Sequence, residues 1–86
     1  MEQPISIDEL LGHSAWLRGL ATALVSDAAR ADDLVQDTWF AALRSPPPAG
    51  SAPRKWLGRV ARNLASNARR SERRRGEHEA RAVGER

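Results

Sequence analysis

Apolar residues in the first half of the chain recur three or four positions apart, the spacing of one face of an α-helix. They predict a first helix from about Ile7 to Val25, with Ser6 and Glu9 at capping-box spacing at its start. Ser26 and Asp27 end this helix and offer an N-cap for the next one. The apolar stripe consists of Leu10, Leu17, Leu20, Ala21 and Leu24.

A second helix is predicted over residues 28–44. Its core-facing arc consists of Ala31, Leu34, Val35, Thr38, Trp39 and Ala42. The opposite arc collects Asp33, Gln36, Asp37 and Phe40, and an aromatic ring among acids on an outer face is unusual. This arc is a candidate contact surface for a basic protein. On spacing alone, an ordinary solvated face explains it equally well.

Three consecutive prolines, Pro46–Pro48, interrupt the helical pattern, because proline lacks an amide donor and has a fixed φ. We predict a loop here, followed by a third helix from near Ser51, a candidate N-cap, to about Arg75, with Pro53 in its first turn. Residues 76–86 have little apolar content and are predicted to form a flexible tail or linker. The third apolar stripe is narrow: Leu57, Val60, Ala61, Leu64 and Ala68.

These elements predict an all-α fold: a compact three-helix bundle, or four helices with a short extra turn, forming one domain over residues 1–75. Turn signals are too sparse for an all-β domain. Each predicted helix carries one tryptophan, Trp16, Trp39 or Trp56, and we expect these large rings to fill the centre of the small core.

Charge is distributed unevenly along the 86 residues, although the formal net charge is only +3. Residues 1–53 have a balance of −4, whereas residues 54–75 carry nine basic side chains against Glu72 alone. Two electrically different ends suggest two different partners.

The third helix carries the strongest signal for function. Arginines suit phosphates, helix-borne asparagines can read base edges, and an aromatic ring can stack on an unpaired base. The alternative is a solvated helix that happens to be basic, but the one-sided excess of charge and the interleaved Trp and Asn favour nucleic-acid binding. One flank carries Trp56, Arg59, Asn63, Asn67 and Arg70, and the far side carries Arg62, Ser66, Arg69 and Arg73.

No set of catalytic residues emerges, so we expect no enzyme activity. Asp32 and Asp33 are adjacent and would point about 100° apart on a helix. Cysteine is absent, and His13 and His78 lie far apart, so we expect no disulfide, metal site or cofactor. The N-terminus is unlike a secretory signal and no stretch has membrane-spanning length, which makes the cytoplasm the expected location.

Two segments resemble motifs of the extracytoplasmic-function (ECF) sigma factors of bacterial RNA polymerase. Residues 32–39, DDLVQDTW, resemble the signature (D/E)DLVQ(E/D)(T/A)F. Residues 56–65, WLGRVARNLA, resemble the segment WLYRIARNLA. The order and separation of the two motifs match the family, and the likeness covers roughly residues 10–75.

The resemblance implies a sigma factor region 2 bundle that binds core RNA polymerase and recognises and melts the promoter −10 element. The DLVQ helix would dock on the clamp coiled coil of the largest subunit, through Asp33, Leu34, Gln36, Asp37, Phe40 and Leu43. Asn63 and Asn67 would contact a flipped base of the non-template single strand. The DNA backbone would be held by Arg59, Arg62, Arg69 and Arg70. Trp56 would pack in the core, act as a wedge in the DNA, or do both.

The sequence departs from the family at three points. Its 86 residues leave no room for the usual helix-turn-helix domain for the −35 element. The loop 45–53 lacks the aromatic residue often found before the Trp-Leu pair. Gly58 replaces the usual aromatic after that pair, at a cost of about 1 kcal/mol in helix propensity relative to Ala.

Two other functions are compatible with the pattern. The helices could form an interaction module that engages an anti-sigma protein without binding DNA. The third helix could instead lie on an anionic membrane, although its thin apolar stripe disfavours this.

Overall fold

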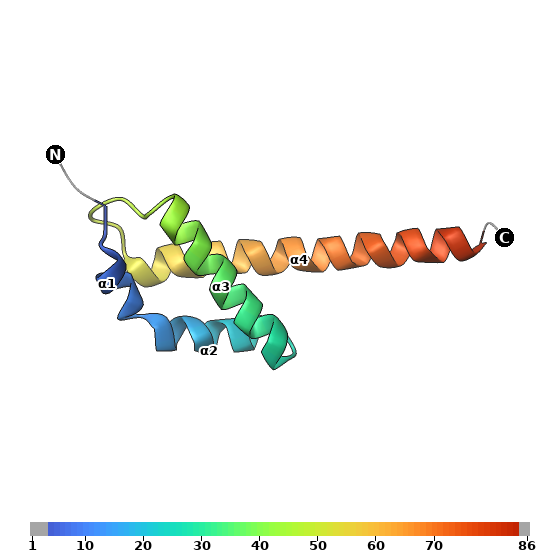
Figure 1. The fold of residues 1–86 in the computed structure, drawn as a ribbon, viewed down its shortest axis with the longest axis horizontal. Coiled ribbons are helices and arrows are strands. Elements are labelled where there is room, and N and C mark those ends of the chain that lie inside the picture. Colours follow the sequence, from blue (N-terminus) through green and yellow to red (C-terminus); the bar gives the residue numbers. More distant parts are fainter. Residues whose placement is uncertain (1–3, 85–86) are drawn as a thin grey trace.

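The computed structural model describes residues 4–84, with side chains up to Gly76, and over these residues the chain is helical without strands. The four helices are α1 (Ile7–Leu11), α2 (Ser14–Leu24), α3 (Ala28–Arg44) and α4 (Pro53–Gly84). Helices α2, α3 and α4 contact one another, and α4 continues well past the other two (Figure 1). The predicted all-α bundle with a short extra helix is confirmed.

The prediction of one continuous helix over residues 7–25 is wrong, because the chain turns at Gly12 and His13. Ser6 caps α1 as predicted, accepting a hydrogen bond from the Glu9 amide at 3.2 Å. The Gly12 amide closes α1 on the carbonyl of Asp8, and His13, with φ −104° and ψ 13°, leaves the helical path before α2 begins. This turn allows Leu10 and Leu17 to be fully buried on differently directed helices (Figure 1).

Leucine and alanine occupy the centre of the core. The predicted inner arc of α3 is confirmed, since all its members are buried except the half-buried Trp39. On α4 the buried row is Leu57, Ala61 and Ala65, spaced four apart, and the predicted Ala68 lies outside it and is exposed. The fully or nearly fully buried apolar side chains are Leu10, Leu17, Ala21, Ala31, Leu34, Val35, Ala42, Leu57, Ala61 and Ala65.

The expectation that the tryptophans fill the centre of the core is wrong. Trp16, Trp39 and Trp56 are half-buried and pack against the edge of the core instead. The physical reason is the alanine content of the facing helices, because short side chains let the backbones approach closely and leave little volume for a ring.

The proline loop between α3 and α4 is held in place by the N-terminal segment. Pro47 is fully buried, and its carbonyl accepts a hydrogen bond from the Ile5 amide at 3.1 Å. Gly50 adopts a φ of 85°, a conformation that favours glycine. Helix α4 begins at Pro53, as the fixed φ of proline favours, so the residue before it is Ala52 and the predicted N-cap Ser51 is wrong.

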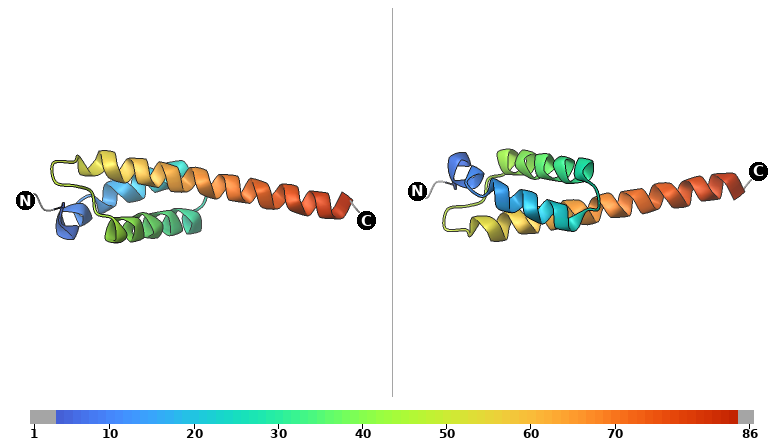
Figure 2. Two further views of the ribbon diagram at one scale, coloured as in Figure 1. Left: turned by 90° about the horizontal axis from the view of Figure 1, so that it is seen from above. Right: turned by 90° about the horizontal axis from the view of Figure 1, so that it is seen from below.

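The predicted end of the third helix near Arg75 is also wrong, because α4 remains helical to Gly84. Most residues after Gly76 are Glu, Ala and Arg, which have good helix propensity and need no apolar partner to extend a helix already formed. The proposal that residues 76–86 act as a linker stays a prediction. The two views in Figure 2 show α4 projecting from the bundle, which gives the molecule dimensions of 61 × 27 × 16 Å.

Candidate functional site

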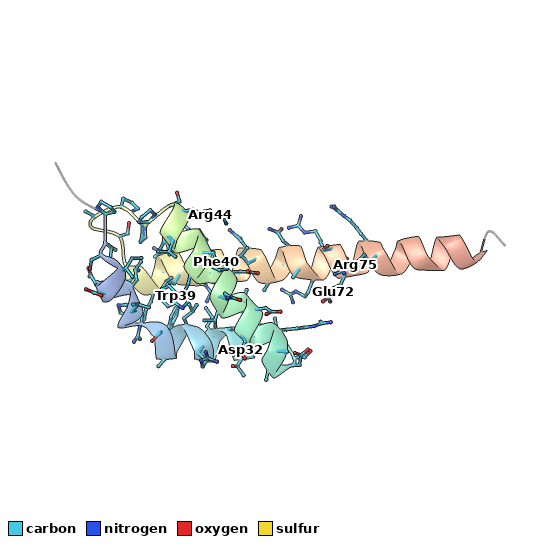
Figure 3. All side chains as sticks on the ribbon, in the orientation of Figure 1. Asp32, Trp39, Phe40, Arg44, Glu72 and Arg75 are labelled. Carbon is cyan, nitrogen blue, oxygen red and sulfur yellow. The ribbon has the colours of Figure 1, made fainter. Side chains whose placement is uncertain are left out.

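The outer face of α3 combines acids with exposed apolar side chains. Asp27 fixes the start of this helix by accepting a hydrogen bond from the Arg30 amide at 2.8 Å. Phe40 and Leu43 are 51% and 61% exposed on this face. Figure 3 shows Phe40 on the exposed side of α3. We call this surface the acidic face: Asp33, Gln36, Asp37, Phe40 and Leu43, all of which are exposed.

The three aspartates of α3 differ in their surroundings. Asp32 forms an ion pair with Arg18 of α2 at 2.7 Å. Within the described part of the chain, neither Asp33 nor Asp37 forms an ion pair. Two uncompensated carboxylates therefore give the acidic face a negative potential that favours a basic protein and opposes DNA.

Leu34 does not belong to this surface, although its motif placed it there. Its side chain is only 6% exposed and packs in the core. The Thr38 hydroxyl donates to the Leu34 carbonyl at 2.7 Å, which leaves this buried hydroxyl satisfied. A partner docked on the acidic face would meet little of the Leu34 side chain, and the contact predicted for Leu34 stays a prediction.

A groove continues from the acidic face towards α4. Its lining is apolar in the middle and carries one acid and one base: Asp37, Phe40, Leu43, Arg44 and Leu64. An amphipathic helix with an apolar stripe between charged residues has the complementary chemistry.

One flank of α4 presents the predicted nucleic-acid side chains. Arg59, Asn63, Asn67 and Arg70 are exposed, and Trp56 is half-buried beside them against the core. Among the described side chains, neither asparagine amide takes part in a hydrogen bond. Their donors and acceptors are thus available for base edges. We call these five residues the basic flank.

By helical spacing, Arg62 and Arg69 lie on a different side of α4 from the basic flank. Both are exposed, but Arg62 lies over Gly58 on the side of α4 that faces α2. A Cβ atom at Gly58 would lie 2.9 Å from the Arg62 guanidinium and 3.4 Å from the Trp16 ring. The missing side chain at Gly58 therefore makes room for Trp16 against the α4 backbone, and an aromatic side chain at this position would displace that ring.

The start of α4 is tied to α2 by a small cluster. The Arg54 guanidinium lies 5.5 Å from the centre of the Trp16 ring, a cation–π distance. The Arg54 Nε also donates to His13 Nδ1 at 3.2 Å. These contacts fix the orientation of the first turn of α4, from which Trp56 and Arg59 project.

An open pocket lies where the proline loop meets the first turns of α4. Its lining combines the Trp56 ring with two cations and the loop: Pro48, Ser51, Ala52, Lys55, Trp56 and Arg59. Lys55 and the individual loop residues were not among the predicted site residues. The spacing of Lys55 and Arg59, one helical turn apart, was the available signal, but the path of the loop was not readable from the sequence.

The described residues contain no cluster of three or more His, Cys, Asp or Glu side chains that could hold a metal ion. None of the described helices is both long enough and apolar enough to cross a membrane.

A comparison with protein families adds one finding. A family model described as Sigma-70 region 2 matches residues 11–75, which include both the acidic face and the basic flank. Searches of curated proteins and of solved structures gave no match.

Proposed function

Since this chain belongs to the sigma-70 region 2 family, we propose that it docks on core RNA polymerase through the acidic face and recognises the promoter −10 element through the basic flank. The family consists of non-enzymatic transcription factors that act in initiation, and its members bind core polymerase and promoter DNA. The observation that carries the proposal is the simultaneous exposure of Asp37 on α3 and Asn63 on α4, on surfaces of opposite charge.

Docking on a protein is the role that suits the acidic face. Asp33 and Asp37 carry unpaired negative charge, while Phe40 and Leu43 add exposed apolar area that a partner can desolvate. The adjoining groove suits one helix of a coiled coil. The likeness of residues 32–39 to the DLVQ signature directs this proposal to the clamp coiled coil of the largest polymerase subunit.

Strand separation is the role that suits the basic flank and the neighbouring pocket. Extracting a base from a duplex costs a few kcal/mol, and a site that binds only the extruded base offsets that cost. Stacking on an aromatic ring contributes about 1–3 kcal/mol per base, which Trp56 in the pocket wall is able to supply. Asn63 and Asn67 offer free side-chain amides for the base edge, and Arg59 is available for the phosphates of the DNA backbone. Binding energy then melts the DNA without chemical catalysis.

We further assign the chain to the ECF type of sigma factor. The support is the pair of motifs in register, DDLVQDTW and WLGRVARNLA, separated by one short loop. Gly58 departs from the second motif, which has an aromatic residue at this position. The ring of Trp16 lies in the space beside Gly58 instead.

The decisive experiment is capture of core RNA polymerase by the immobilised full chain. The double variant Asp33→Arg/Asp37→Arg should lose capture, because it reverses the charge of the acidic face. The matched control Asp8→Arg/Glu9→Arg makes the same charge change on α1 and should retain capture. Equal capture by both variants would show that the acidic face is not the docking surface. Capture of an anti-sigma protein without affinity for single-stranded −10 DNA would favour a purely regulatory module instead.

A further inference from the structure

The part of α4 beyond Asn67 is surrounded by positive charge. Five exposed arginines fall within one short stretch, and at 100° per residue they cover about two thirds of the helix circumference. These residues are Arg69, Arg70, Arg73, Arg74 and Arg75. Figures 1 and 2 show this stretch leaving the bundle, and among its described side chains Glu72 is the one that contacts α3, through Arg30. We call it the projecting basic segment.

Glu72, the one acid among residues 68–76, points towards α3. The Glu72 carboxylate accepts one hydrogen bond from the Arg30 guanidinium of α3 at 3.1 Å, and a second N–O contact of this ion pair measures 3.0 Å. This two-point contact directs Glu72 towards α3, where Glu72 shares the positive charge of Arg30 with Asp27. Figure 3 shows Glu72 and Arg75 on the part of α4 that lies beyond the crossing with α3. A polyanion approaching the projecting basic segment therefore meets arginines and no free carboxylate among residues 68–76.

Two consecutive stretches of α4, residues 56–67 and 68–76, differ in the chemistry that they offer. Residues 56–67 include one Trp and two Asn, which suit bases, whereas residues 68–76 include neither and offer arginine on several sides. A single strand presents phosphates to one side of a helix. A duplex groove, about 12 Å wide, admits an α-helix of 10–12 Å diameter and places phosphates on both sides of it. Arginines distributed around the axis match the duplex and not the single strand.

We propose that the projecting basic segment binds the phosphates of double-stranded DNA without reading sequence. The distance from Arg69 to Arg75 along the axis is about 9 Å at 1.5 Å per residue. Duplex DNA carries one charge per roughly 1.7 Å of axis, so several phosphates lie within reach of these side chains. This goes beyond the proposed function: it adds a duplex contact next to the flank that receives the separated strand.

The test is binding of the full chain to two short duplexes of unrelated sequence, measured by fluorescence anisotropy over a range of salt concentrations. The wild-type chain should bind both duplexes with affinities that agree within about twofold and fall steeply with salt. Arg74→Gln/Arg75→Gln should weaken duplex binding about tenfold and reduce the log–log salt slope by one to two. Glutamine keeps the helix propensity close to that of arginine, so the helix is retained.

The matched control is Arg18→Gln/Arg44→Gln, which removes the same charge from α2 and α3 and should change duplex affinity by less than about twofold. The inference is overturned if the wild-type chain does not bind duplex at low salt, if the control loses as much affinity as the test variant, or if one duplex is strongly preferred. Polymerase capture should be unchanged in Arg74→Gln/Arg75→Gln, and its loss would reassign the segment to a protein contact. Failure here leaves the proposed function standing, because that proposal is tested on Asp33 and Asp37.

Discussion

The Ile5 amide donates to the carbonyl oxygen of Pro47, 42 positions later in the chain, at 3.1 Å. Pro47 is fully buried, and the loop that it anchors continues through Pro48, Ser51 and Ala52, which line the pocket beside Trp56. The N-terminal segment therefore helps to shape the pocket that we propose for an extruded base.

Removing this hydrogen bond should loosen the loop. Ile5→Pro eliminates the donor and should lower the free energy of unfolding by about 1 kcal/mol more than Ile5→Ala, which keeps the amide and loses only the side chain. Hydrogen exchange at the Ser51 amide, which is bonded to the Pro48 carbonyl at 3.1 Å, should be faster in Ile5→Pro. Equal exchange in the two variants would mean that the loop keeps its shape without this tether.

Leu34 and Leu43 should separate stability from docking. Leu34→Ala removes a side chain that is 6% exposed and should cost about 2–4 kcal/mol in urea unfolding. Leu43→Ala removes one that is 61% exposed and should change stability by less than about 0.5 kcal/mol, while weakening polymerase capture. A destabilised Leu43→Ala, or a Leu34→Ala with unchanged stability, would contradict the packing described for α3.

Gly58 should tolerate a methyl group but no ring. In Gly58→Ala the new Cβ displaces only the flexible end of Arg62, and the gain in helix propensity should raise stability by up to about 1 kcal/mol. Gly58→Tyr must displace the Trp16 ring as well and should destabilise by about 1–3 kcal/mol. Thermal unfolding of both variants, with Gly19→Ala as a helical glycine in open space, checks the order of stabilities.

Asparagine and arginine variants of the basic flank should differ in their salt dependence. Asn63→Ala and Asn67→Ala should weaken binding of the −10 single strand by about 1–3 kcal/mol each without changing the salt slope. Arg59→Gln should reduce that slope by about 0.7, the value for one phosphate on a single strand. Anisotropy titrations with the polymerase-bound chain measure both quantities. A slope change in the asparagine variants would indicate backbone contact instead of base recognition.

The sequence predicted α3 to the residue, because Asp27 and the proline loop give clear signals at both ends. The turn at Gly12 and His13 was missed because neither residue excludes a helix, and because Leu10 and Leu17 have the spacing of one face of a continuous helix. The end of α4 was misjudged for the opposite reason: its last turns need no apolar partner, so apolar content was a poor guide there.

The two charged surfaces were predictable because exposed charge follows directly from helical spacing. The individual residues of each surface were harder to predict. Leu34 belongs to the same motif as Asp33, and only packing separates a core residue from a surface residue one position away. The pocket at Trp56 depends on where Pro47 enters the core, a long-range contact that no local pattern encodes.

Half of the buried apolar side chains are alanines: Ala21, Ala31, Ala42, Ala61 and Ala65. Each removes little area from water, so the helices associate with a small hydrophobic gain per residue. In such a domain, a partner that binds only the folded chain shifts the equilibrium between the folded and unfolded states towards the folded state. A partner present at a hundredfold excess over its dissociation constant adds about 2.7 kcal/mol to the free energy of unfolding. The free energy of unfolding of the chain should therefore increase with the concentration of free core polymerase.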